Sequence, residues 1–454
     1  MLESFTSPSS GFASLDDTRS RRLQRKVLFV AGMGFFTDAY DLFVIGIVVK
    51  ILADQWHLSP TQISLLSSTT LAASAFGALV FGRIADMLGR KRMYGVEMAI
   101  LAVGALASAL SPDVTWLIVF RVIIGIGVGG DYPVSATIMS EYSGTASRGR
   151  MVGLLFSMQA AGLIVGPLVA VILLASGIDH SLVWRVLLGL GAAPALAVCY
   201  LRRRIQETPR FAAASSSARR RPAPARQSFI SGWVRIARSP RLLRWVIGAS
   251  AAWFLLDFAY YGNTIASPEI ISLLSPTASL THATLLQLGI FVVFALPGYL
   301  VAITCLDRIG RRAIQLLGFA IMSAMFAAIA IIPGVSTTVA PFVILFGISY
   351  FFTEFGPNTT TFVYPAEIFP TEVRTTGHGI AAAMGKMGAF AGTYLFTDML
   401  SAWGIRGAEG VAAGVALLGL IVTAALLPEP KGKSLEQIEH EAFEPSPALV
   451  PAAA

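Results

Sequence analysis

The sequence has few charged residues, few histidines and almost no cysteine, and each shortage excludes a class of protein. Charged residues make up 13% of the 454 residues, about half of the share that a soluble domain carries. The two cysteines, Cys199 and Cys305, lie in apolar segments without metal-binding spacing, so we expect neither a disulfide framework nor a metal site. Five histidines and no cluster of metal-ligating residues give no support for an enzyme or a cofactor.

The residues that are present are mostly apolar, which indicates an integral membrane protein. Hydrophobic residues make up 55% of the chain, and the mean hydropathy is +0.69. Most apolar runs are about 20 residues long, the length of a membrane-spanning helix. The buried strands of a soluble α/β enzyme would give shorter runs. The net charge of +8 lies in the loops, so we do not expect nucleic-acid binding.

The apolar runs predict an all-α membrane protein with twelve transmembrane helices in two bundles of six. The first run follows the basic segment RSRRLQRK and has no small-residue cleavage pattern, so it is a membrane helix rather than a signal peptide. Every second loop holds the Arg and Lys residues, which places these loops and both termini in the cytoplasm. The predicted spans are 27–51, 62–85, 91–111, 114–140, 149–175, 182–202, 242–267, 283–305, 311–333, 338–362, 375–400 and 408–428.

A break in composition divides the chain between the two bundles. The segment after the sixth span is basic and rich in Ser, Ala and Pro, which is typical of a linker, and a short interfacial helix is expected near Trp233. The expected domains are a cytoplasmic tail at 1–26, bundles at 27–203 and 242–428, a cytoplasmic linker at 204–241 and a cytoplasmic tail at 429–454.

Short motifs recur in the two halves. GRIADMLGRKR after the second span is matched by LDRIGRR after the eighth, and SEYSGTASRGRMVG after the fourth is matched by AEIFPTEVRTTGHG after the tenth. In the second pair a Glu precedes an Arg by seven residues, as Glu141 and Arg148 and as Glu367 and Arg374. Motifs at matched positions favour duplicated bundles that rock about a central site over a fusion of two separate six-helix proteins.

Residues 121–141 place a carboxylate, Asp131, inside an apolar run of membrane length. A charge at this depth costs a few kcal/mol or more, so it indicates a functional site. The glycines before it fit close helix packing, and they are not a nucleotide-binding loop because no strand precedes them and no GK[ST] follows. Other polar residues inside predicted spans of both halves are Asp38, Asp41, Tyr132, Gln159, Trp253, Asp257, Tyr260, Tyr261, Asn263, Glu354, Asn358 and Lys386.

The second half supplies a predicted cation site. Trp253, Asp257 and Tyr261 are four residues apart and share one helix face; two aromatics alone would fit a packing stripe, but a carboxylate facing lipid is costly. Lys386 lies among small residues, and a buried lysine must be paired or lose its proton. It forms either a structural ion pair with Asp257 or a site for an anionic substrate, and we favour the second. Donors for an oxyanion are available on Tyr132, Gln159, Trp253, Tyr261 and Asn358.

These motifs resemble those of the major facilitator superfamily. The residues that match its loop signature and its fourth-helix pattern are Gly82, Asp86, Gly89, Arg90, Lys91, Arg92, Arg121, Gly125 and Gly127. The runs GIGVGGDYPVSATIMSEYS, FGPNTTTFVYPAEIFPTEVRTTGHGIAAAMGKMGAFAG and WFLLDFAYYGN resemble more specifically its phosphate:proton symporter family. The resemblance extends from the first helix to the last and leaves out the linker and the termini.

The resemblance implies a major facilitator fold and import of inorganic phosphate with protons by alternating access across a lipid bilayer. We expect a monomer without a cofactor in the plasma membrane, or in the cell inner membrane of a bacterium. The family's phosphate-binding residues correspond to Tyr132, Gln159, Trp253, Asp257, Tyr261, Asn358 and Lys386. Its proton-linked carboxylates correspond to Asp38, Asp41, Asp131 and again Asp257.

The charged residues of the repeated loops have two interpretations. They are predicted to gate the inner face of the carrier, or they only fix the topology of the chain. The residues concerned are Asp86, Arg90, Glu141, Arg148, Asp307, Arg311, Glu367 and Arg374.

Three positions depart from the family pattern and leave the substrate open. Glu354 stands where eukaryotic phosphate members tend to carry Asn, and Tyr260 and Asn263 replace more apolar residues. One alternative is the same carrier with another small solute, such as an organic acid or a phosphorylated metabolite. Another is a phosphate sensor that does not transport, although a sensor does not need the carboxylates and gate loops that this sequence retains.

Overall fold

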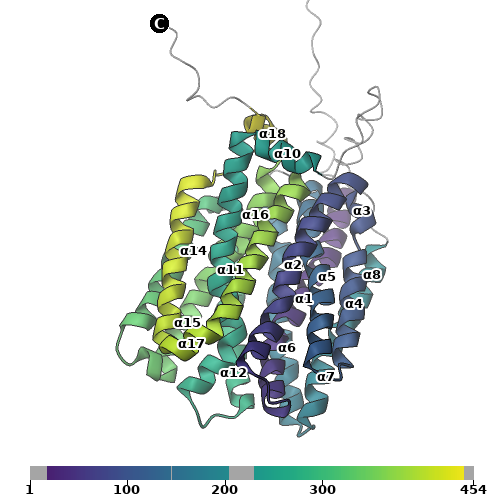
Figure 1. Cartoon of the computed structure of the whole chain (residues 1–454). Coiled ribbons are helices and arrows are strands. Elements are labelled where there is room, and N and C mark those ends of the chain that lie inside the picture. The colour runs from purple at the N-terminus through teal and green to yellow at the C-terminus, as the bar shows by residue number, and fades with distance from the viewer. Residues whose placement is uncertain (1–17, 145, 204–229, 444–454) are drawn as a thin grey trace, which may run out of the picture.

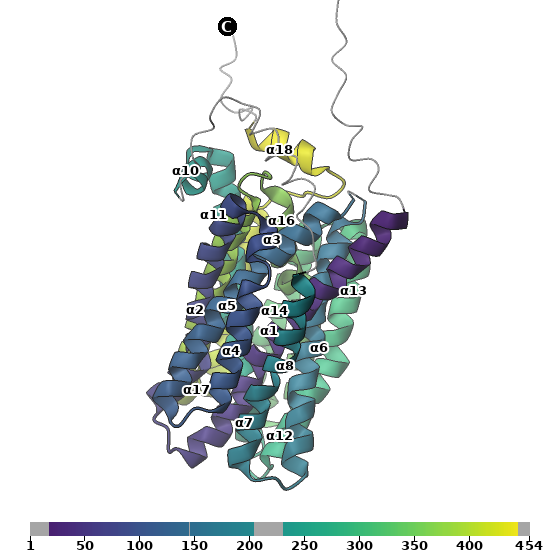
Figure 2. The same ribbon diagram turned by 90° about the vertical axis from the view of Figure 1, so that its right-hand side faces the viewer.

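The computed structural model describes residues 18–144, 146–203 and 230–443, and these are helical almost throughout (Figure 1). Most of the helices run between two ends of an elongated molecule. Helices α10 and α18 and the first turns of α1 lie at the same end, which we call the inner end, and the opposite end is the outer end (Figure 2). The expectations for most of the linker, for most of the N-terminal tail and for residues 444–454 of the C-terminal tail lie outside the described residues.

Local signals in the sequence set the bounds of the helices in the first half. Ser59 and Gln62 form a capping box at the start of α2, and Asp113 accepts two backbone N–H groups at the start of α5. The helices are α1 (Thr18–Gln55), α2 (Pro60–Leu88), α3 (Arg90–Met93), α4 (Val96–Ala109), α5 (Val114–Tyr142), α6 (Arg148–Ala175), α7 (His180–Leu190) and α8 (Ala192–Arg202).

The second half opens with the short helix expected near Trp233, which the structure confirms as α10 (Ser231–Arg238). Ser239 then caps the following helix, whose first residue is Pro240. The remaining elements are α11 (Pro240–Leu274), α12 (Leu280–Ile290), the π-helical turn η3 (Phe291–Ala295), α13 (Leu296–Ile309), α14 (Arg311–Ile331), the 3₁₀ turn η4 (Val335–Thr337), α15 (Val339–Thr353), the π-helical turn η5 (Glu354–Asn358), α16 (Thr359–Ile368), α17 (Arg374–Leu426) and α18 (Leu435–Phe443).

The number of spans agrees with the prediction. Within the described ranges, nine helical stretches are long and apolar enough to cross a membrane, when α7 with α8, α12 with α13, and α15 with α16 each count as one. One of them, α17, contains two spans, because Gly404 leaves the helical conformation (φ 64°, ψ −173°) and bends the chain back. The 38-residue α1 and the shorter apolar helix α4 complete the twelve.

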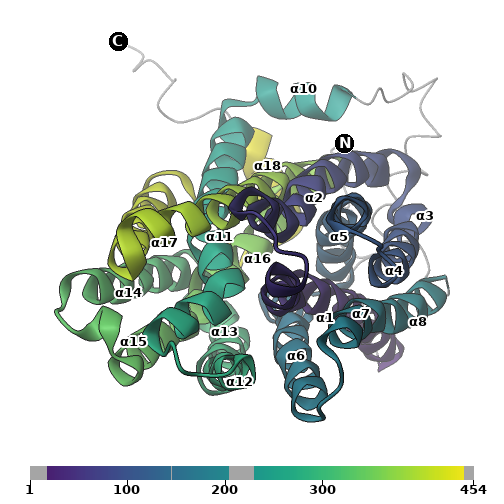
Figure 3. The same cartoon turned by 60° about the horizontal axis from the view of Figure 1, so that its bottom comes forward.

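The helices form two bundles that correspond to the two halves of the sequence (Figure 3). Helices α1 to α8 make up one bundle and α11 to α17 the other. The bundles meet where α2 packs along α17, α1 along α11, and α6 along α12 and α13. Any residue that faces this surface from either side lies between two bodies that come from different parts of the chain.

Glycines let the helices approach closely, as the sequence predicts. A Cβ atom on Gly129 of α5 would lie 1.9 Å from the carbonyl oxygen of Ser74 in α2. A Cβ atom on Gly388 of α17 would lie 2.1 Å from the carbonyl oxygen of Phe254 in α11. Both contacts are with backbone, which cannot move aside, so larger residues would push the helices apart.

We expect Gly129→Ala to lower the stability of the folded carrier by about 1–3 kcal/mol, the usual cost of overpacking. Thermal unfolding of the purified protein in detergent measures this as a lower Tm. Gly414→Ala is the matched control, because a Cβ atom on Gly414 meets nothing within 4 Å. An unchanged Tm for Gly129→Ala would contradict the packing role.

Candidate functional site

A buried lysine lies between the two bundles. Lys386 of α17 is 1% exposed. Its Nζ donates a hydrogen bond to the hydroxyl of Tyr261 at 2.7 Å and lies 3.6 Å from Oδ2 of Asp257, both on α11. From the other bundle, the ring of Tyr132 on α5 presents its face at 4.3 Å from Nζ. The ammonium group is thus held by a carboxylate, a hydroxyl and two aromatic faces.

Aromatic rings from both bundles surround this cation. Trp253 lies 6.2 Å from Tyr132 between ring centres, and Tyr132 also contacts Phe35 of α1 and Phe362 of α16. A Cβ atom on Gly385 would collide with the Trp253 ring, so the glycine beside Lys386 makes room for that ring. Trp253, Asp257 and Tyr261 are all buried, and their spacing brings them to the face of α11 that meets α17.

Two further predicted binding residues lie buried on other helices. Asn358 ends the π-helical turn η5, and its amide nitrogen donates to the hydroxyl of Tyr299 at 2.9 Å and to the carboxylate of Glu354. Gln159 lies on α6, and its Oε1 has no hydrogen-bond partner among the described residues. These two residues therefore extend the buried polar region beyond the immediate neighbours of Lys386.

The carboxylates of the first bundle have different surroundings. Asp41 forms an ion pair with Arg121 at 2.7 Å, and Asp131 forms one with Arg202 at 2.7 Å. Neither oxygen of the fully buried Asp38 has a hydrogen-bond partner within the part of the chain that the structure describes. Asp38 is therefore the member of the predicted proton-linked set whose charge is least compensated.

Sequence reasoning missed the partners of Asp131. Arg202 contacts Asp131 and also Glu97 of α4, at 3.0 Å, and Ser135 donates to Asp131 at 2.5 Å. Arg202 and Glu97 lie near the ends of their predicted spans, where charges commonly reach the membrane surface. The sequence feature that could have identified Arg202 and Glu97 as partners is that both lie inside predicted apolar runs of the same bundle as Asp131.

At the inner end, the repeated loops form the same charge cluster twice. Asp86 pairs with Arg90 at 3.1 Å, and Arg90 with Glu141 at 3.2 Å. In the second bundle, Asp307 pairs with Arg311 at 2.7 Å, and Arg311 with Glu367 at 2.8 Å. The motif echoes in the sequence thus correspond to equivalent sets of contacts.

The two clusters also bind across the bundles. Arg374 of α17 lies 3.4 Å from Glu141 of α5. Asp86 of α2 accepts hydrogen bonds from the backbone N–H and the hydroxyl of Thr376, at 2.7 and 2.6 Å. On the other side, the backbone N–H of Arg150 donates to Asp307 at 2.9 Å. The inner end is therefore closed by polar contacts between the halves.

Arg148 completes the predicted set, and it too reaches across the bundles. Its guanidinium donates to the carbonyl oxygen of Lys433, which precedes α18, at 3.4 Å. All eight predicted gate residues therefore lie at the inner end, in the two clusters or beside them.

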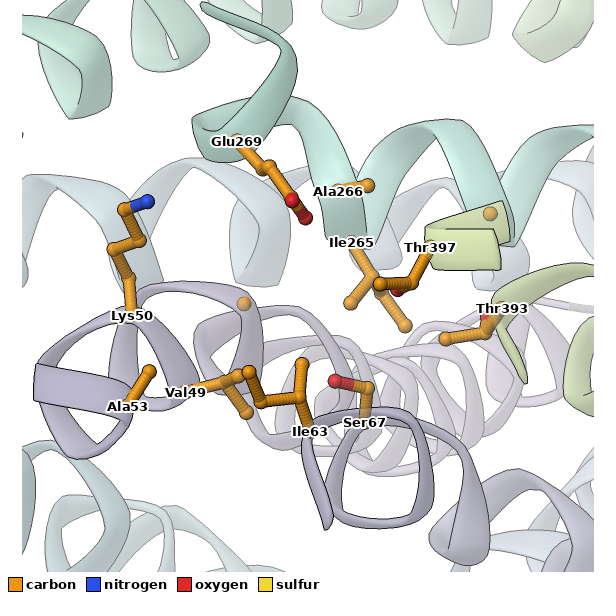
Figure 4. A pocket seen from close by; sticks show the side chains of 12 residues that line it. Val49, Lys50, Ala53, Ile63, Ser67, Ile265, Ala266, Glu269, Thr393 and Thr397 are labelled. Carbon is orange, nitrogen blue, oxygen red and sulfur yellow. The ribbon is translucent and has the colours of Figure 1, made fainter. Parts of the chain in front are cut away.

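The outer end has a pocket between the bundles, shown in Figure 4. Lys50 of α1 and Glu269 of α11 line it from opposite bundles. Gly262 also lines the pocket and directly follows Tyr261, so the pocket points from the outer end toward Lys386. The full lining is Gly46, Val49, Lys50, Ala53, Ile63, Ser67, Gly262, Ile265, Ala266, Glu269, Thr393 and Thr397.

Comparisons with known proteins agree with this architecture. Residues 27–442 match the model of the family described as Sugar (and other) transporter. The chain is 34% identical to the Probable inorganic phosphate transporter 1-6 of Arabidopsis thaliana over 496 residues, 94% of this chain and 96% of that one. It is 35% identical to the Inorganic phosphate transporter 1-11 of Oryza sativa subsp. japonica over 498 residues, 94% of this chain and 89% of that one.

A solved structure shares the fold. The major facilitator proton:xylose symporter XylE, bound to 6-bromo-6-deoxy-D-glucose, matches with a TM-score of 0.75 and 19% identity over 94% of this chain and 100% of that one. The fold and the matches together define a membrane transporter of the major facilitator superfamily, not an enzyme. The chain belongs to the Sugar (and other) transporter family, and its relatives at 34–35% identity are inorganic phosphate transporters, as the motifs indicate.

We expect Glu141→Gln to loosen the inner end, because Glu141 pairs with Arg90 and, across the bundles, with Arg374. The readout is thiol labelling of Ser140→Cys, in a chain whose Cys199 and Cys305 are replaced by Ser. Ser140 precedes Glu141 and is buried, and its hydroxyl donates across the bundles to the carbonyl oxygen of Ala366. The labelling rate should rise roughly tenfold or more, since breaking a buried pair costs more than the ~1.4 kcal/mol that equals a factor of ten.

Glu372→Gln is the matched control for this labelling experiment. Glu372 pairs with Arg235 at the same end, but both side chains are almost half exposed, and exposed pairs contribute little. Equal labelling rates in the two variants would show that Glu141 does not hold the inner end closed.

Proposed function

We propose that this chain imports inorganic phosphate together with protons by alternating access. The observation that carries the proposal is the ammonium group of Lys386, buried between the bundles and faced by residues of both. A buried cation at the meeting surface of two repeats suits the binding of a small anion that must be passed from one side to the other. The names of the relatives support phosphate as that anion.

The groups around Lys386 suit a tetrahedral oxyanion. The ammonium group has three donors, and charge-assisted hydrogen bonds to an oxyanion are roughly twice as strong as neutral ones. Tyr132, Tyr261 and Trp253 add O–H and N–H donors close to it. In this proposal Asp257 accepts a hydrogen bond from a protonated phosphate oxygen, which makes its position beside the anion favourable.

Gln159 and Asn358 complete the proposed binding set from α6 and η5. Both side chains are buried and carry amide N–H donors. Asn358 would have to turn one N–H from its present partners, Tyr299 or Glu354, toward the phosphate. Binding would therefore draw η5 and α6 toward Lys386, which links the anion to a movement of both bundles.

Protons enter the proposal through Asp38, Asp41, Asp131 and Asp257. Asp38 takes the first proton, because it has no compensating partner in the described chain, whereas Arg121 holds Asp41 and Arg202 holds Asp131. Protonation of Asp131 would release Arg202 to Glu97 alone. Proton and phosphate drive one another only if both favour the same conformations, which is a linkage between two sites.

Alternating access follows from the contacts at the two ends. The described structure is closed at the inner end by Glu141, Arg374 and Asp86, and its pocket lies at the outer end. In the proposed cycle phosphate enters through the pocket, the pocket closes, and the inner clusters separate. In the outward-facing state the gate residues keep the inner end closed, and their separation opens the site to the inside.

The placement in the cell is proposed from the charge of the loops. Basic inner loops favour a cytoplasmic inner end with both termini there. The carrier would function as a monomer in the plasma membrane, or in the inner membrane of a bacterium. A proton that enters a cell with an inside-negative potential moves down that potential and contributes about 2.3 kcal/mol per 100 mV.

Proteoliposomes with an imposed pH gradient, acidic outside, test the function directly. The unmodified protein should accumulate labelled phosphate, and arsenate should compete where organic anions do not. Lys386→Ala should lower phosphate affinity roughly ten- to hundredfold, because a hydrogen bond to a charged group contributes about 1.5–3 kcal/mol. Titration calorimetry measures the affinity.

Lys433→Ala is the control for Lys386→Ala. Lys433 lies at the inner end with a side chain that is 40% exposed, and its partner is Glu441. Full phosphate affinity in Lys386→Ala would remove Lys386 from the site. Uptake of organic anions instead of phosphate by the unmodified protein would reject phosphate as the substrate.

Asp38→Asn should abolish accumulation driven by the pH gradient yet keep the exchange of labelled for unlabelled phosphate between preloaded vesicles. The substitution removes a proton-binding group while it leaves Lys386 and its neighbours in place. Asp54→Asn, an exposed position on the same helix, should retain both activities. Normal gradient-driven accumulation in Asp38→Asn would exclude Asp38 as a proton carrier.

A further inference from the structure

Among the described residues, most buried carboxylates have a cationic partner, and three do not. Those that form ion pairs are Asp41, Asp86, Glu97, Asp131, Glu141, Asp257 and Glu367. In the chain as described, Asp38, Glu354 and Glu409 are buried and have no ion pair. Asp38 belongs to the proposed proton set, whereas the family resemblance assigns no role to the other two.

An ionised carboxylate without a cation is unfavourable in the interior of a membrane protein. Desolvation costs several kcal/mol, and the group either finds a partner or binds a proton. Glu354 has one oxygen, Oε1, without a hydrogen-bond partner among the described residues. This position suits a group that accepts a proton, because the proton restores the missing hydrogen-bonding capacity and removes the charge.

The backbone around Glu354 departs from regular helix. Glu354 begins the π-helical turn η5, in which Gly356 has non-helical angles (φ −99°, ψ −113°) and precedes Pro357. On the neighbouring helix α13, Gly298 leaves room for the Glu354 side chain. Such π turns recur at functional sites, and this one joins Glu354 to the proposed phosphate residue Asn358.

Three neighbouring helices bring other titratable groups close to Glu354. They are Asp257 and Tyr260 of α11, Tyr299 of α13 and Tyr350 of α15. Three of these are neutral phenols, and Asp257 is a second acid, already paired with Lys386. Within the described ranges, the surroundings of Glu354 therefore contain hydrogen-bonding groups and a second acid, but no cation paired with it.

We propose that Glu354 is a proton-binding residue of the transport cycle, located in the second bundle and linked to phosphate through Asn358. The inference rests on the proposed function. A proton from the outer solution binds the free carboxylate oxygen of Glu354, crosses with the phosphate and leaves to the inner solution. The second bundle then carries a proton of its own, in addition to those on the aspartates of the first.

The contacts of Asn358 couple the proton to the anion. Both N–H groups of its amide are engaged, one by Tyr299 and one by the carboxylate of Glu354. Protonation of Glu354 weakens the second of these bonds, so the N–H can turn to a phosphate oxygen. It also removes a negative charge beside the arriving anion. Proton and phosphate thus bind more tightly together than apart, which is the sign that symport requires.

Glu409 of α17 offers a matched comparison. It is buried without an ion pair in the described chain, as Glu354 is, but it lies near Asn263 and Tyr350 and contacts none of the proposed phosphate residues. Glu409→Gln therefore makes the same chemical change in a similar setting while it leaves Asn358 untouched.

The test measures how many protons accompany each phosphate. Proteoliposomes are held at set voltages and pH gradients, and the phosphate gradient at which net flux stops gives the ratio. We expect Glu354→Gln to carry about one proton fewer per phosphate than the unmodified protein, and Glu409→Gln and Glu354→Asp to keep the original ratio. If Glu354→Gln does not fold, Glu354→Asn, which also removes the charge, takes its place.

A second readout uses the purified protein in detergent. Phosphate affinity should weaken less steeply with rising pH in Glu354→Gln than in the unmodified protein, because one linked proton is missing. An unchanged ratio and an unchanged pH slope would mean that Glu354 keeps its proton throughout and would overturn the inference alone. Failure of the unmodified protein to transport phosphate would instead reject the proposed function.

Discussion

The ammonium group of Lys386 is held away from water by the hydroxyl of Tyr261, the carboxylate of Asp257 and the ring of Tyr132. Removing such a group from water costs several kcal/mol, which only close partners can offset. Those partners come from α11 of the same bundle and from α5 of the other, so both helices must approach α17 closely. The glycines at the contacts, such as Gly388 against the backbone of α11, make that approach possible.

The apolar runs were sufficient to predict the twelve spans and the division into two bundles, because the membrane imposes a length on each helix. They also predicted a break between the last two spans, at 400–408, which is where Gly404 separates the two parts of α17. The turn at Gly404 lies in the short segment LSAWGIRGAE, whose mixed polarity indicates a connection between two spans.

The sequence predicts those site residues that are isolated charges within apolar runs. Lys386 and Asp257 each stand out in an apolar run, and a charge in such a place calls for a partner. Arg202 and Glu97 did not stand out, because charges near span ends usually reach the membrane surface. Their contacts with Asp131 depend on how α4, α5 and α8 pack, which spacing along the chain does not encode.

The two inner clusters combine symmetry with one departure from it. Gly89 and Gly310 both adopt positive φ, 98° and 109°, and each starts a helix with the arginine that follows. The arginines then bind the equivalent acids within their own bundles. The contact of Arg374 with Glu141 is an ion pair between the bundles, and together with the hydrogen bonds that cross at Asp86 and Asp307 it holds the halves together.

Because the contact of Arg374 with Glu141 is buried, dissolved salt has little influence on it. Dissolved salt screens charges that water reaches, over about 8 Å at physiological ionic strength, and screens buried pairs much less. Arg374 and Glu141 are both fully buried, whereas Arg235 and Glu372 at the same end are exposed. Changes in ionic strength therefore act mainly on the exposed pair of Arg235 with Glu372 and have little effect on the buried contact of Arg374 with Glu141, so salt alone does not open the inner end.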